Sequence, residues 1–218
     1  MNSPHCAVYL EKYSYFYRQI KTVLFNNLPM KILVLDNYDS FVYNLVHALE
    51  ELSDAEITVA KNDEIELEEV RFFDKILLSP GPGLPEQAGI MPQLLQKYAP
   101  SKSILGVCLG HQAIAQNFKA ELFNLEEPLH GVATTMQIVK EDYLFDRLPQ
   151  KIEIGHYHSW VARFENNDQL KVLAYDQAGN IMALKHREYD VRGVQFHPES
   201  ILTPSGKEIL RNWVLHKV

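Results

Sequence analysis

Short apolar runs alternate with stretches of helical spacing through the first half of the chain. Four runs suit buried strands of a parallel sheet, at residues 31–35, 56–60, 75–79 and 103–107. Apolar residues at helical spacing predict helices at residues 41–52, 91–98 and 111–117, and the acidic stretch 63–70 is expected to be a short surface helix. This rhythm predicts an α/β fold with a doubly wound, mostly parallel sheet and helices on both faces.

The pattern changes after residue 120. Short strands with alternating character are expected at residues 121–123, 132–139, 152–157, 170–175 and 181–186. Turn signals separate several of them, at residues 126–128, 166–168 and 178–180. These strands are predicted to form an antiparallel extension of the parallel sheet. A final helix is expected to begin after the Thr-Pro-Ser sequence at residues 203–205.

The strand at residues 103–107 runs into the sequence Gly-Val-Cys-Leu-Gly, centred on Cys108. This has the form of a nucleophile elbow, a sharp turn from strand to helix, with cysteine in place of serine. Gly106 and Gly110 leave room for the turn, and the N-terminus of the next helix favours a thiolate at Cys108. The alternative is a buried cysteine at the end of a core strand.

A second polar cluster follows the strand at residues 191–196. His197 and Glu199 stand in the sequence Phe-His-Pro-Glu-Ser. A cysteine nucleophile needs a base to carry its proton, and the base needs an acceptor that fixes its orientation. The sequence therefore suggests a Cys108–His197–Glu199 triad, although most such His-Pro-Glu tripeptides taken alone are surface turns.

A glycine-rich loop, Ser-Pro-Gly-Pro-Gly, follows the strand at residues 75–79 and contains Gly81, Pro82 and Gly83. Such a loop is able to aim backbone N–H groups at a developing oxyanion. It is not a phosphate-binding loop, because no Gly-Lys-Ser/Thr follows it. Its alternative is a plain turn from strand to loop. The loop and the elbow lie at predicted carboxyl ends of strands, where ligands bind in such folds.

Together these motifs resemble the class I, triad-type glutamine amidotransferases. Within that family, the chain is similar to the small glutaminase subunits of anthranilate synthase and of aminodeoxychorismate synthase. The resemblance covers residues 30–218. It rests on Leu-Asp-Asn-Tyr-Asp-Ser-Phe at 35–41, on the loop, the elbow and the His-Pro-Glu motif, and on Tyr-His-Ser at 157–159.

The resemblance implies a flavodoxin-like core and hydrolysis of glutamine to glutamate and ammonia. Leu109 and the glycine loop are expected to stabilise the oxyanion, and Gln112, Ser159 and Trp160 to bind glutamine. It also implies a separate chorismate-binding large subunit, in a heterodimer or heterotetramer. No cofactor is expected in this subunit, while Mg²⁺ is expected in the partner.

Length, net charge and cysteine content exclude several classes of protein. A chain of 218 residues suits one globular domain, expected at residues 30–218. The net charge of −7 without a basic tract argues against nucleic-acid binding, and no apolar run of about 18 residues predicts a membrane span. The two cysteines cannot form a disulfide framework. A reactive thiol fits a reducing cytoplasm best.

Residues 1–29 differ from the rest in their many aromatic side chains, and they lack the order of a signal peptide. Because the related subunits usually begin near Met30, this segment is expected to be a misassigned start or a dispensable extension. A short helix packed on the domain is the alternative.

Three other hypotheses remain open. His156 and His158 stand two apart and are able to share a metal ion, although no third ligand lies at a telling spacing. The chain is also compatible with a stand-alone cysteine hydrolase, such as a γ-glutamyl peptidase, or with a regulatory subunit whose site has decayed. His130 matches a loop that lies near the partner in the related subunits.

Overall fold

One nine-stranded sheet, with strand order β2-β1-β3-β4-β9-β8-β7-β5-β6, carries the fold. A computed structural model describes residues 29–217 of the chain. The predictions made for residues 1–29 therefore lie outside the described residues, apart from Pro29 itself. From Lys31 onward the chain forms one compact unit.

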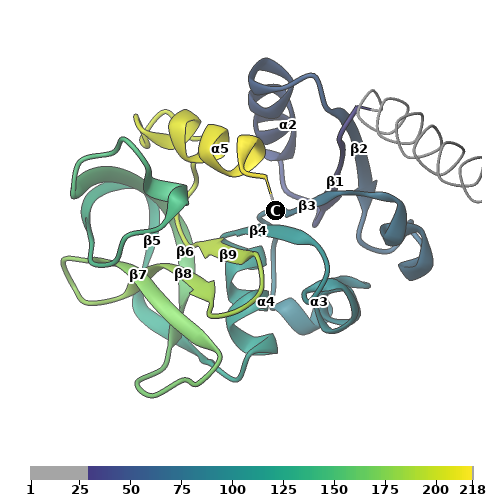
Figure 1. The fold of residues 1–218 in the computed structure, drawn as a ribbon. Coiled ribbons are helices and arrows are strands. Elements are labelled where there is room, and N and C mark those ends of the chain that lie inside the picture. Colours follow the sequence, from purple (N-terminus) through teal and green to yellow (C-terminus); the bar gives the residue numbers. More distant parts are fainter. Residues whose placement is uncertain (1–28, 218) are drawn as a thin grey trace, which may run out of the picture. The chain divides into compact units, whose positions relative to one another are not determined.

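The first half of the sheet is parallel, as predicted. Its strands are β1 (Lys31–Asp36), β2 (Glu56–Lys61), β3 (Lys75–Leu78), β4 (Ser103–Val107) and β9 (Val191–Val194). The helices are α2 (Val42–Leu52), α3 (Met91–Tyr98), α4 (Leu109–Asn117) and α5 (Gly206–Leu215). Figure 1 shows α2 and α5 on one face of these strands and α3 and α4 on the other. The doubly wound prediction is confirmed.

The second half is antiparallel, which confirms the predicted extension. It consists of β5 (Glu121–Ile138), β6 (Lys151–Arg163), β7 (Leu170–Asp176) and β8 (Ile181–His186). Strand β8 pairs with β9, so this half continues directly from the parallel half. Single-turn or short 3₁₀ helices lie at Leu67–Phe72 (η1), Pro85–Gln87 (η2) and Tyr143–Phe145 (η3).

Two local predictions are wrong. The two expected strands at residues 121–123 and 132–139 are one strand, β5, which ends at Ile138, and the expected turn at residues 126–128 lies inside it. The pairing with β6 shifts register between Asn124 and Leu129 and again between His130 and Val132. Such irregularities accommodate Pro128, which has no N–H to donate to a ladder.

The expected helix at residues 63–70 is also displaced, to η1 (Leu67–Phe72). The chain makes a turn after β2, where the Glu64 N–H donates to the Lys61 carbonyl at 3.1 Å. The Asn62 carbonyl accepts from the Ile90 N–H at 2.8 Å. This contact with a distant segment fixes the turn. The 3₁₀ helix η1 therefore begins only at Leu67, three residues after Glu64.

The central strands are buried along their whole length. Strands β3, β4 and β9 contain no exposed residue, because helices cover both faces of the sheet. Their side chains therefore stabilise the core instead of binding ligands. Polar chemistry is confined to the two edges of the sheet where these strands begin and end.

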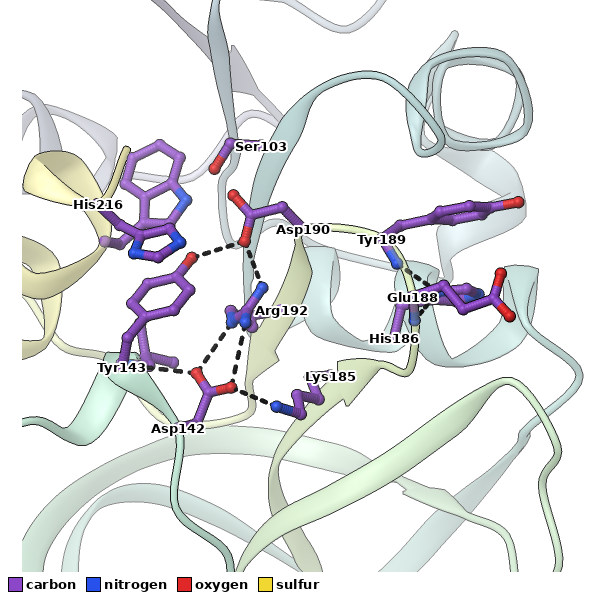
Figure 2. A network of polar contacts seen from close by, with 12 residues as sticks. Ser103, Asp142, Tyr143, Lys185, His186, Glu188, Tyr189, Asp190, Arg192 and His216 are labelled. Carbon is purple, nitrogen blue, oxygen red and sulfur yellow. Dashed lines mark hydrogen bonds and ion pairs between the residues drawn. The ribbon is translucent and has the colours of Figure 1, made fainter. Parts of the chain in front are cut away.

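At the edge where the parallel strands begin, a charged network ties the two halves together (Figure 2). Arg192, in β9, donates to both Asp142 carboxylate oxygens, with Nε–Oδ1 and Nη2–Oδ2 distances of 2.9 and 3.1 Å. Lys185, in β8, donates to the same carboxylate at 2.8 Å. Arg192 also pairs with Asp190, which accepts from the Tyr143 hydroxyl at 2.9 Å. The network joins η3 to β8 and β9.

Replacement of Asp142 by Asn should lower the free energy of unfolding by about 3 kcal/mol, because it leaves the guanidinium of Arg192 and the ammonium of Lys185 without their shared carboxylate. Urea denaturation of the variant measures the loss. Asp146→Asn, at a nearby exposed position, is the matched control. Equal stability of both variants and the unmodified chain would contradict this account of the network.

Candidate active site

Cys108 occupies a strained turn between β4 and α4. Its backbone angles are φ 51° and ψ −99°, in the left-handed half of φ space that residues with a side chain rarely adopt. The Cys108 N–H donates to the Val194 carbonyl at 2.9 Å, and its carbonyl accepts from the Gln112 N–H at 3.0 Å. The turn is thus fixed from β9 on one side and from α4 on the other.

The two glycines that flank Cys108 allow this close crossing. A Cβ atom on Gly106 would lie 2.4 Å from the carbonyl carbon and oxygen of Gly110. A Cβ atom on Gly110 would lie 2.4 Å from the carbonyl oxygen of Leu78, in β3. Both positions therefore exclude a side chain, as the elbow hypothesis requires. The sulfur lies at the edge where the parallel strands end and at the N-terminus of α4.

The glycine loop lies beside the elbow. A Cβ atom on Gly81 would lie 2.9 Å from the Leu109 side chain and 2.5 Å from the Asn37 carbonyl oxygen. Asn37 anchors the start of the loop through hydrogen bonds of 2.9 Å from its backbone N–H to the Ser79 hydroxyl and from its side-chain amide to the Ser79 carbonyl. Asn62 in turn donates to the Asn37 side-chain oxygen at 2.9 Å. Pro82 and Gly83 follow, exposed at the edge of the sheet.

His197 and Glu199 form a buried pair directly after β9. The Nδ1–Oε1 distance is 2.6 Å, and the side chains are 3% and 0% exposed. The His197 N–H donates to the Gly155 carbonyl at 3.1 Å, and the Thr203 hydroxyl donates to the His197 carbonyl at 2.7 Å. Strand β6 and the segment that precedes α5 thus fix the main chain at His197.

The second ring nitrogen of His197, Nε2, is buried and makes no hydrogen bond of ordinary geometry within residues 29–217. Cys108 also interacts with the His197 side chain. Burial lowers the pKa of His197, but Cys108 and Glu199 outweigh burial and raise this pKa to about 10. The imidazole is therefore protonated beside the sulfur near neutral pH.

A pair of glutamine side chains completes the surroundings of the sulfur. The Gln112 side-chain amide donates to the Trp160 carbonyl at 3.0 Å and to the Gln195 side-chain oxygen at 3.3 Å. The Gln195 amide donates to the Cys108 sulfur at 3.7 Å. Ser159 and Trp160 lie half-buried in β6. These contacts place Gly81 beside Leu109 and Trp160 beside Gln112, close to Cys108.

Gln195 was missed by the sequence analysis. The signal was present, because Gln195 stands two positions before His197 in an alternating stretch, and such residues share a face of an extended chain. A polar residue on the same face of the extended chain as a proposed catalytic base is therefore a candidate for the same site.

The comparisons with known proteins assign the chain to a family. The family model for class-I glutamine amidotransferases matches residues 33–217. The chain belongs to this family. The amidotransferase is 45% identical to the anthranilate synthase component 2 of Thermus thermophilus over 190 residues, which are 85% of this chain and 92% of that one.

A second relative supports the assignment, and a solved structure supports the fold. The aminodeoxychorismate/anthranilate synthase component 2 of Bacillus subtilis is 40% identical over 186 residues, covering 84% of this chain and 95% of that one. The crystal structure of a glutamine amidotransferase from Thermotoga maritima has a TM-score of 0.67 at 13% identity, covering 86% and 97% of the two chains. The latter likeness concerns the fold alone.

The two histidines considered as metal ligands bond to each other in this amidotransferase. His156 Nδ1 and His158 Nε2 lie 2.9 Å apart, and His156 Nε2 lies 2.6 Å from the Thr134 hydroxyl. Residues 29–217 contain no group of three or more His, Cys, Asp or Glu side chains placed to hold a metal ion. In the same part of the chain, no helix has the length and apolar content needed to cross a membrane.

Glu199→Gln should lower the pKa of His197 by more than about one unit, because burial then acts on the imidazolium with less opposition. Nuclear magnetic resonance titration of the His197 ring measures the change. Glu208→Gln, on the partly exposed side of α5, serves as the control. An unchanged His197 titration would contradict the coupling between the two residues.

Proposed function

We propose that this amidotransferase hydrolyses the side-chain amide of L-glutamine and passes the ammonia to a separate large subunit that converts chorismate into anthranilate. The observation that carries the proposal is the buried His197–Glu199 pair beside Cys108, which stands on a strained turn at a helix N-terminus. A protonated imidazole beside a cysteine favours the thiolate, which is the nucleophilic form.

In the first step, the Cys108 sulfur attacks the amide carbon, a carbon–sulfur bond forms, and the carbonyl oxygen becomes an oxyanion. The backbone N–H groups of Leu109 and of Gly81 or Gly83 are proposed as its donors, since the loop lies against Leu109. One such donor contributes about 10²–10³ in rate in other enzymes.

In the second step, His197 gives its proton to the departing nitrogen. The carbon–nitrogen bond breaks, ammonia leaves, and a γ-glutamyl thioester remains on Cys108. The imidazole, now neutral, takes a proton from water, which hydrolyses the thioester to glutamate and restores the thiolate. Glu199 orients the ring and stabilises its charge in the first step.

The amino-acid end of glutamine is proposed to bind along β6, at the backbone of Ser159 and Trp160, with Pro82 and Gln112 at its sides. The Gln112 amide nitrogen already makes two hydrogen bonds within the protein. Its remaining capacity for substrate is therefore its side-chain oxygen. The half reaction needs no cofactor in this subunit, and Mg²⁺ would serve the chorismate chemistry of the partner.

The large subunit is proposed to dock over the catalytic edge. Exposed aromatic side chains gather there at Tyr38, Phe41 and Tyr43, and the Phe41 ring centroid lies 6.3 Å from that of His197. Such exposed apolar groups are typical of interaction sites. The loop at His130 is a second proposed contact. The stoichiometry follows the related subunits, as a heterodimer or heterotetramer, and the proposed location is the cytoplasm.

A second candidate product has support of its own. The relative from Bacillus subtilis is named for both aminodeoxychorismate and anthranilate synthesis. One glutaminase subunit is thus able to serve either amination, because the triad delivers only ammonia. A folate-pathway role, alone or shared, is the alternative to anthranilate.

Cys108→Ala should abolish glutamine-dependent product formation by the reconstituted complex, with a loss of at least about a thousandfold. Ammonia-dependent formation should stay within about twofold, because the chemistry of the large subunit needs only ammonia. Both rates are measured on the same preparation. Loss of both activities in an assembled complex would show that the division of labour is wrong.

The product is decided by mixing this chain with each candidate large subunit from the same organism, together with chorismate and glutamine. We expect glutamine-dependent anthranilate, identified by its fluorescence and chromatographic retention. Turnover only with the aminodeoxychorismate partner would overturn that choice and leave the glutaminase role intact. Full glutaminase activity of the lone chain, unchanged by either partner, would favour a stand-alone hydrolase.

A further inference from the structure

Gln195 places an uncharged polar group against the sulfur of the proposed nucleophile. The residue follows β9 directly, and its side chain is completely buried. Its backbone N–H donates to the Met182 carbonyl in β8 at 2.9 Å, so the main chain at this point is fixed. Its side-chain nitrogen lies 3.7 Å from the Cys108 sulfur, within the range of an N–H···S hydrogen bond.

The neighbouring bonds determine which end of the Gln195 amide faces the sulfur. The Trp160 carbonyl is only able to accept, so the Gln112 atom bonded to it is the side-chain nitrogen. That same nitrogen lies 3.3 Å from Gln195, which must therefore present its oxygen there. The Gln195 nitrogen is left to point at Cys108. A backbone carbonyl thus fixes a donor, and not an acceptor, against the sulfur.

Only one of the histidines near Cys108 is charged near neutral pH, so a neutral donor is able to influence the sulfur. His197 is the one nearby histidine whose pKa is raised, and Glu199 pairs with its far side. Burial lowers the pKa of His111, in α4, to about 4. In β6, burial likewise lowers the pKa of His156, and lowers that of His158 to about 3.

These three other imidazoles are therefore neutral near neutral pH. A negative sulfur in this buried region has His197 as its charged partner, and any further stabilisation must come from dipoles. A hydrogen bond to the ionised form of a group favours that form. The amide of Gln195 is a donor of this kind in direct contact with the sulfur.

We propose that Gln195 is a catalytic residue that donates a hydrogen bond to the Cys108 thiolate, and that Gln112 is the positioning residue that fixes the direction of this bond. The assignment rests on the proposed glutaminase function for its biological meaning. The bond itself is a property of the free protein and is testable without glutamine.

The same contact also fixes the sulfur in space. The Gln195 donor, just after β9, and the imidazolium of His197 together restrict the directions open to the thiolate. Because Gln195 is uncharged, it stabilises the thiolate without adding a second cation that would repel the proton on His197.

The test measures the alkylation of Cys108 by iodoacetamide as a function of pH. The full chain carries Cys6→Ser, so that Cys108 is its sole cysteine. Gln195→Met keeps the length of the side chain and removes the donor. Gln195→Glu keeps the shape, still accepts from Gln112, and turns a carboxylate oxygen toward the sulfur. Gln116→Met, at an exposed position on α4, is the matched control.

We expect Gln195→Met to slow the alkylation of Cys108 severalfold on the acidic side of the profile, because the ionised sulfur then lacks a donor. Gln195→Glu should slow alkylation further, because two negative charges then meet. With the partner present, kcat for glutamine should fall while KM changes little. Gln116→Met should match the unmodified chain in every measurement.

An alkylation profile for both Gln195 variants that matches the control would overturn the proposal, whatever happens to turnover. Should Gln195→Met fail to unfold cooperatively on heating, Gln195→Glu decides the question by itself. If the unmodified chain shows no glutaminase activity with any partner, the proposed function fails. The alkylation comparison still decides the role of Gln195 in that case.

Discussion

The architecture of the site depends on one strained turn. Cys108 adopts a positive φ, and it does so because β4 passes so close to α4 that neither Gly106 nor Gly110 has room for a Cβ atom. Gly110 also lies against the Leu78 carbonyl, so the turn sets the spacing between α4 and two adjacent strands. A buried parallel sheet supplies the stability that holds such a turn.

The polar groups at the two ends of the parallel strands have different roles. Where the parallel strands begin, Arg192 and Asp142 form a bidentate pair that joins distant segments, and its charges are satisfied within the protein. Where the strands end, His197 Nε2 makes no hydrogen bond of ordinary geometry within residues 29–217, although Cys108 interacts with the ring. Stability and reactivity are thus separated along the strands, so a change at one edge need not disturb the other.

Local signals in the sequence made much of the fold and of the candidate site predictable. The apolar runs and the glycines around Cys108 indicated the parallel core and the elbow, because burial and close crossing impose composition on a few consecutive residues. The continuous β5, the displaced helix at Leu67–Phe72 and the contact of Gln195 were not predicted. Each depends on residues far away in the sequence. The pairing with β6 determines the first, the Asn62–Ile90 hydrogen bond the second, and the approach of the segment after β9 to Cys108 the third.

The groups around the Cys108 sulfur determine which of the buried imidazoles near it carries a charge. A second cation beside Cys108 would stabilise the thiolate but would also lower the pKa of His197, which in the proposed mechanism holds a proton for the leaving nitrogen. The neutral imidazoles of His111 and His158 and the amide of Gln195 avoid that conflict. Burial keeps these accessory histidines uncharged, while Cys108 and Glu199 keep the imidazole of His197 charged.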